Sequence, residues 1–70
     1  MRIRLREWRQ RRLLTQEELA QKSGVGVNTI IRVEAGQWPR GSTVKRLATA
    51  LDVAPDDLIE VESEGNAQAA

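Results

Sequence analysis

Residues 15–36 read TQEELAQKSGVGVNTIIRVEAG, and this stretch decides the fold. Thr15 and Glu18 have the spacing of a capping box, in which each side chain accepts a hydrogen bond from the other residue's backbone N–H. A helix is therefore predicted over 16–23. Gly24 follows it and can adopt the left-handed conformation that ends a helix.

A second helix is predicted directly after this turn. Gly26 is a tolerated N-cap, although a weaker one than serine, so the helix is expected over 27–35. Gly36 then supplies the next left-handed stop. Two short helices joined by so tight a turn have the dimensions of a helix-turn-helix.

The rest of the chain is also predicted to be helical. Residues 2–12 carry Leu5 and Trp8 on one face of a helix, among arginines. A fourth helix, capped by Gly41 or Ser42, is expected to run to Leu51, because apolar residues recur there at helical spacing. A fifth opens at Pro55, where proline suits the first helical position. Strands are not expected, because no segment alternates apolar and polar residues. The predicted fold is all-α, a compact five-helix bundle over residues 1–62, followed by a disordered tail over 63–70.

Composition narrows the range of functions. The 70 residues include neither cysteine nor histidine, which excludes disulfides, thiol nucleophiles, imidazole bases and ordinary zinc sites. No apolar run exceeds two residues, so neither a membrane span nor a signal peptide is expected. An enzyme, a cofactor and a small-molecule ligand are not expected either. Of the classes of protein considered, a cytoplasmic binding module is the one that the composition leaves open.

The charge is unevenly distributed along the chain. Residues 1–46 hold all eleven basic side chains and four acids, a net charge of +7. Residues 47–70 hold six acids and no base, a net charge of −6. A basic half favours an anionic partner, nucleic acid first. The alternative is a solvated arginine face on the first helix.

The chain resembles the Cro/CI-type, or XRE, helix-turn-helix family in Thr15-Gln-Glu-Glu-Leu-Ala-Gln-Lys22, Gly24-Val25, Thr29-Ile30, Arg32-Val33-Glu34 and Gly36. The later run LATALDV, residues 47–53, is similar to the junction of the last two helices in that family. The resemblance covers residues 2 to about 60. It implies a lambda-repressor-like domain that binds double-stranded DNA with helix 27–35 in the major groove.

The outward face of helix 27–35 suits this role. On a helical wheel, Ile30 and Val33 point to the core, whereas Asn28, Ile31, Arg32 and Ala35 point the other way. The predicted base-reading residues are Val27, Asn28, Ile31 and Arg32. Asparagine pairs with adenine and arginine with guanine in the major groove, and apolar side chains contact the thymine methyl group. The alternative is a solvated helix face with Ile31 packed on a neighbour.

A second group of residues is predicted to contact DNA phosphates. Gln16 opens its helix, and the resemblance implies a phosphate contact for it; helix N-termini bind anions readily. The other candidates are Arg40, Ser42, Thr43 and Lys45. Trp38 is expected to pack on the core or at an interface rather than on DNA.

The resemblance also implies structural features. Arg9 and Glu34 match positions that form a partly buried ion pair, which fixes the angle of the reading helix. Leu13 and Asp52 stand where the family usually has glycine, and Asp52 is expected to take a left-handed conformation.

The first functional hypothesis is a sequence-specific DNA-binding module, a repressor-like transcriptional regulator located at the nucleoid. Such modules usually bind pseudo-palindromic sites as homodimers. The alternative is an antitoxin-type or other protein-interaction module that docks a partner through its acidic C-terminal half.

Overall fold

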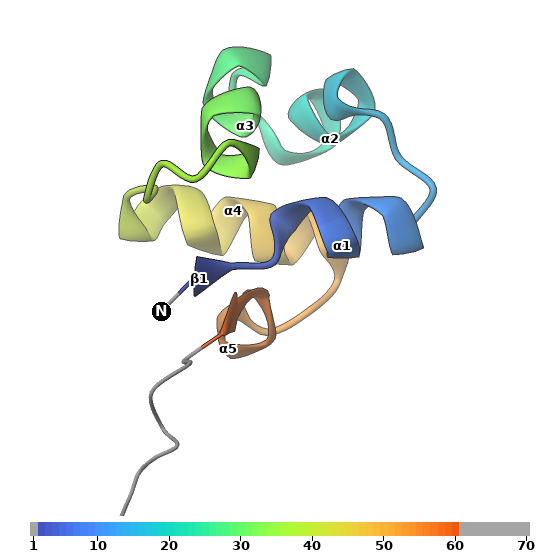
Figure 1. The fold of residues 1–70 in the computed structure, drawn as a ribbon. Helices are drawn as coiled ribbons and strands as arrows, with labels where there is room; N and C mark the ends of the chain where they lie inside the picture. Colours follow the sequence, from blue (N-terminus) through green and yellow to red (C-terminus); the bar gives the residue numbers. More distant parts are fainter. Residues whose placement is uncertain (1, 61–70) are drawn as a thin grey trace, which may run out of the picture.

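Five helices and two very short strands make up residues 2–60, the part of the chain that the computed structural model describes (Figure 1). In chain order they are β1 (Arg2–Ile3), α1 (Leu5–Arg11), α2 (Gln16–Ser23), α3 (Val27–Glu34), α4 (Gly41–Leu51), α5 (Pro55–Leu58) and β2 (Ile59–Glu60). In Figure 1, α2 and α3 lie above α1 and α4, whereas α5 lies below them. The predicted five-helix bundle is confirmed.

The expectation that the chain has no strands is wrong. Arg2–Ile3 pairs antiparallel with Ile59–Glu60, so the first helix begins at Leu5 rather than at residue 2. The Arg2 guanidinium also donates to the Glu60 carboxylate at 2.5 Å across the pair. Two-residue strands are too short to show alternation in a sequence, which is why the pattern missed them.

The start of α2 and the turn between α2 and α3 are both built as the sequence predicts. Thr15 Oγ1 accepts the Glu18 backbone N–H at 3.0 Å, and the Glu18 carboxylate accepts the Thr15 N–H at 2.8 Å. Gly24 is left-handed, with φ of +75°, and ends α2. Gly26 is the N-cap of α3 and, having no side chain, contributes no capping bond. The capping box therefore fixes the start of α2, and the residues from Gly24 to Gly26 form the turn that leads into α3.

The start of α4 differs from the prediction. Its N-cap is Arg40, in an extended conformation, and neither Gly41 nor Ser42 caps it. Its C-cap, Asp52, has φ of +60°, which confirms the expected left-handed conformation.

A single apolar core lies between the helices. Every helix contributes to it, with the buried side chains Leu5, Leu19, Val25, Ile30, Val33, Val44, Leu47, Ala48, Ala50, Leu51 and Leu58. Trp8 packs partly buried against this core, and its indole N–H donates to the Asp57 carbonyl at 3.0 Å. Two guanidinium groups, those of Arg11 and Arg12, lie 4.9 and 5.3 Å from the Trp8 ring centre. Trp8 therefore ties α1 to α5.

Within residues 2–60 no helix is both long and apolar enough to cross a membrane. The same residues contain no group of three acidic, histidine or cysteine side chains arranged for a metal ion. The predicted tail over 63–70 and the domain end at residue 62 lie outside the described residues.

Leu13 stands in the turn between α1 and α2 with φ of +59° and is 88% exposed. A left-handed conformation costs a non-glycine residue about 1–2 kcal/mol, and this side chain recovers almost nothing by burial. Leu13→Gly is therefore expected to raise the free energy of unfolding by about 0.5–1 kcal/mol, net of the extra freedom of glycine in the unfolded chain. Urea denaturation measures the difference. Gln10→Gly, on the exposed side of α1, is the control and should destabilise by about 1 kcal/mol. A loss of stability in Leu13→Gly would contradict the argument.

Candidate nucleic-acid interface

Helix α3 presents one face to the core and the other to solvent. Ile30 and Val33 are buried, as predicted. On the opposite side Asn28 and Arg32 are exposed, Ile31 is 45% exposed and Val27 is half-buried. The four predicted base-reading side chains therefore lie together, since residues three and four apart share a face of a helix.

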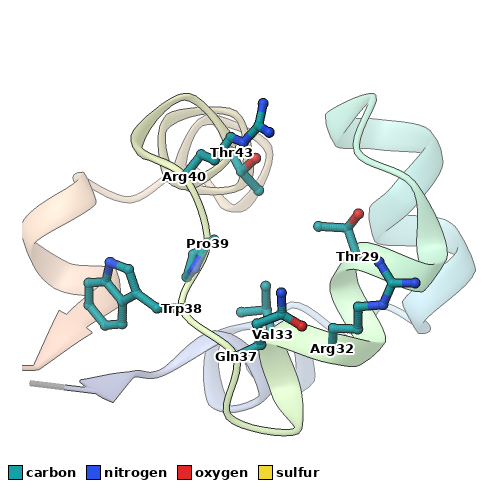
Figure 2. Close-up of a pocket in the computed structure, with 8 residues that line it drawn as sticks. All are labelled: Thr29, Arg32, Val33, Gln37, Trp38, Pro39, Arg40 and Thr43. Carbon is teal, nitrogen blue, oxygen red and sulfur yellow. The ribbon is translucent and has the colours of Figure 1, made fainter.

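A cleft of about 370 Å³ lies between α3 and the start of α4 (Figure 2). Two cations line it, Arg32 from α3 and Arg40 from the loop before α4. Hydroxyl groups come from Thr29 and Thr43, and an amide comes from Gln37. These donors suit an anion with several oxygen atoms, such as a phosphate group.

The structure separates the predicted phosphate ligands. Arg40 and Thr43 lie in the cleft beside Arg32, and Ser42 is exposed at the start of α4. Lys45 instead lines a second hollow, of about 400 Å³, between α2 and α4. Lys22 and Arg46 are its other cations. The cations that line these two hollows thus form two groups rather than one continuous strip.

Gln16 and the predicted ion pair form one hydrogen-bonded cluster. Arg9 donates to both oxygens of Glu34, at 2.6 and 3.1 Å, and also to the Leu14 carbonyl at 2.9 Å. The Gln16 side-chain amide donates to Glu34 Oε1 at 3.1 Å. The Glu34 side chain is 1% exposed. The cluster therefore joins the end of α3 to α1 and to the start of α2. Because an amide carries two N–H groups, Gln16 keeps one donor for another ligand.

This cluster keeps Glu34 ionised. Burial raises the pKa of its carboxyl group, but hydrogen bonds from Arg9 and Gln16 and the charges of Arg9 and Arg6 outweigh burial. The net pKa of Glu34 is lowered from 4.5. The hydrogen bonds of Arg9 to Glu34, and the charge of Glu34, raise the pKa of Arg9 against the effect of burial. Glu34 is a structural anion that positions α3.

Two polar side chains of the cleft, Thr29 and Gln37, are not among the sequence-based candidates. Thr29 lies three residues before Arg32, so the helical period alone would have placed the two side by side. Gln37 follows the left-handed Gly36, and the path of the chain after such a turn has no sequence signal.

Trp38 does not fill the core as one of its predicted roles requires, because it is 48% exposed, whereas its neighbour Pro39 is buried. In Figure 2 its ring points away from Thr29 and Arg32. Its other predicted role, packing at an interface, stays a prediction.

The acidic residues lie away from this site. Asp56 and Asp57 belong to α5, which Figure 1 shows on the opposite side of α1 and α4 from α3. Basic side chains also lie on the α5 side, where Arg2 pairs with Glu60 and Arg12 lines a hollow with Asp52 and Asp57, so the charge asymmetry of the sequence is only partly a spatial one.

Comparisons with known proteins agree with this arrangement. The helix-turn-helix family profile matches residues 5–58. An uncharacterized HTH-type transcriptional regulator from Archaeoglobus fulgidus is 37% identical over 65 residues, which cover 91% of this chain and 93% of that protein. No solved structure matches with statistical significance. The chain belongs to the Cro/CI-type helix-turn-helix family of DNA-binding domains.

Proposed function

We propose that the chain is a transcriptional regulator that binds double-stranded DNA sequence-specifically, with α3 in the major groove. The observation that carries the proposal is the exposed face of α3, where an amide and a guanidinium stand beside two apolar side chains. Asn28 hydrogen-bonds adenine and Arg32 hydrogen-bonds guanine, while Val27 and Ile31 contact the bases beside them. As a regulator of this kind, it acts at the chromosomal DNA and needs no cofactor or catalytic step.

The phosphate contacts surround this helix. Arg40 and Thr43 bind the backbone from the cleft, and Ser42 joins them from the first turn of α4. Gln16 uses its second amide N–H on a phosphate while Glu34 holds the first. Lys45, in the hollow between α2 and α4, adds a contact further along the backbone. These contacts set the orientation of α3 and supply much of the affinity, while the base contacts supply the specificity.

A selection from random duplexes tests the proposal. We expect a recovered motif, and binding of the best duplex should weaken steeply as salt rises, because neutralised phosphates release counterions. A motif with two-fold symmetry indicates a homodimer on a pseudo-palindromic site, and an asymmetric motif indicates a monomer.

Two results would contradict the proposal. Salt-dependent binding without a motif would leave only a non-specific basic surface. No binding at low salt would favour the protein-interaction module, with the partner docked on the acidic side that carries α5.

A further inference from the structure

The exposed side of α4 carries opposite charges toward its two ends. Arg46 and Asp52 stand three residues before and three residues after Thr49, and all three residues are exposed. Residues three apart share a side of a helix, so these three form one stripe along α4 and its C-cap. The stripe runs from a cation through a small polar side chain to an anion.

Each of the two charges lies in a hollow, and the two hollows meet at Thr49. The hollow between α2 and α4 contains Arg46 together with Lys22. A second hollow, of about 660 Å³, contains Asp52 together with Asp57 of α5. Thr49 lines both of them. A basic hollow and an acidic hollow therefore adjoin on one surface of the domain.

The charges of this stripe are not used inside the domain. Within residues 2–60 neither Arg46 nor Asp52 takes part in an ion pair. Arg12 also lines the acidic hollow, but its Nε donates to the Leu51 carbonyl at 2.8 Å and its guanidinium lies 5.3 Å from the Trp8 ring centre. Both ends of the stripe are thus open to a partner.

From this order of charges we infer that α4 is a docking face for a second copy of the chain, with the two α4 helices antiparallel and crossing at Thr49. In a two-fold contact, residues at equal distances on either side of the crossing point face each other. Arg46 of each copy then meets Asp52 of the other, so one contact makes two identical ion pairs. The small Thr49 side chain lets the helix axes approach to about 8–10 Å.

A second copy fits this surface better than a nucleic acid does. DNA lying along the whole stripe would bring its phosphates against Asp52 and Asp57, whereas an acidic protein would meet the same repulsion. The surface of another copy offers a basic hollow to each acidic hollow, and Lys22 and Asp57 add charge to each pair. Because exposed ion pairs contribute little and are screened by salt, the association is weak and salt-sensitive.

Sedimentation equilibrium of the full chain without DNA tests the inference. We expect the parent chain to associate as its concentration rises at low salt, and to dissociate as salt is added. Arg46→Glu and Asp52→Lys should each weaken the association by about tenfold or more, because each replaces both attractive pairs by repulsive ones.

Combining the two substitutions gives the sharpest result. In an equal mixture of Arg46→Glu and Asp52→Lys, one glutamate faces one lysine and the unchanged Arg46 faces the unchanged Asp52. The mixture should therefore associate about as tightly as the parent chain, although each variant alone does not. A chain that carries both substitutions should also recover self-association, since its two pairs are attractive again.

The controls change the net charge equally at other places. Arg32→Glu on α3 and Glu17→Lys on α2 are both exposed and should leave the association nearly unchanged. Asp52 has φ of +60°, a conformation that asparagine tolerates well, so Asp52→Asn removes the charge without straining the C-cap. It should weaken association less than Asp52→Lys does. Circular dichroism shows whether each variant is folded.

Three outcomes would overturn the inference without touching the proposed function, which the duplex selection tests separately. One is a chain that stays monomeric up to about 1 mM at low salt, a concentration at which even weak contacts form. Another is an association that the mixture of variants does not restore. The last is an association that Arg32→Glu or Glu17→Lys weakens as much as the α4 variants do. If the chain is monomeric and Arg46→Glu weakens DNA binding instead, the basic hollow belongs to the DNA backbone.

Discussion

Replacing Glu34 by glutamine is expected to lower the free energy of unfolding by about 3 kcal/mol, because it leaves the partly buried Arg9 guanidinium without a counter-charge. Removing one partner of a buried ion pair costs about 3–5 kcal/mol of stability. Because 14% of the Arg9 side chain is exposed to water, we expect a value at the lower end of that range. The loss is a large part of the stability of so small a domain. Urea denaturation of the variant and of the parent chain measures it.

The acid dependence of this variant gives a second, independent readout. The pKa of Glu34 is lower in the folded state than its ordinary value of 4.5, so its stabilisation is complete above that pH. The stabilisation is lost as pH falls through the folded-state pKa, when the carboxyl group is protonated. The stability difference between the parent chain and Glu34→Gln should therefore shrink below about pH 4.5.

Glu17→Gln is the matched control for Glu34→Gln. Glu17 is an exposed residue in the first turn of α2, so its replacement should change stability by no more than about 0.5 kcal/mol. Two results would show that the cluster does not hold α3 in place. One is a loss of less than about 1 kcal/mol in the free energy of unfolding of Glu34→Gln. The other is a stability difference between this variant and the parent chain that does not change with pH.

Arg32→Ala is expected to weaken binding to the selected duplex by about 5–150-fold, which corresponds to about 1–3 kcal/mol for one lost bidentate contact to guanine. The loss should be specific: one position of the motif should lose its preference for guanine, and the others should keep theirs. A repeat of the selection with the variant measures this directly.

Arg40→Ala is the natural comparison, because both arginines line the same cleft. It should weaken all duplexes by a similar factor and reduce the salt slope by about 1, as expected for a phosphate ligand. If Arg32→Ala behaves in the same way as Arg40→Ala, Arg32 is a phosphate ligand and not a base reader. The cleft gives this outcome a physical basis, since the Arg32 side chain reaches both the cleft and the exposed face of α3.

Most of the fold could be predicted because it depends on local signals. The capping box of Thr15 and Glu18 and the left-handed Gly24 act within a few residues of one another, so a sequence pattern contains all the information. The pairing of Arg2–Ile3 with Ile59–Glu60 depends on residues at opposite ends of the described chain. No local pattern reports such a contact, and the two strands were missed for this reason.

The candidate site likewise has features that local sequence patterns predict and features that they do not. The helical period was enough to separate the buried Ile30 from the exposed Asn28. The contact between Gln16 and Glu34 depends on how α2 meets α3 in space. The grouping of Arg32 with Gln37 and Arg40 depends on how α3 meets the loop before α4. Those groupings require the tertiary structure.

The pairing of β1 with β2 has a practical consequence for building on this domain. Residues 2 and 60 lie side by side, so the two ends of the described chain are close together. In Figure 1 both strands lie across the bundle from α3. A tag, fluorophore or second domain joined through either strand would extend from the same side of the molecule. In the proposed complex such attachments would leave the major groove free, whereas an insertion into the loop between α3 and α4 would collide with the DNA backbone.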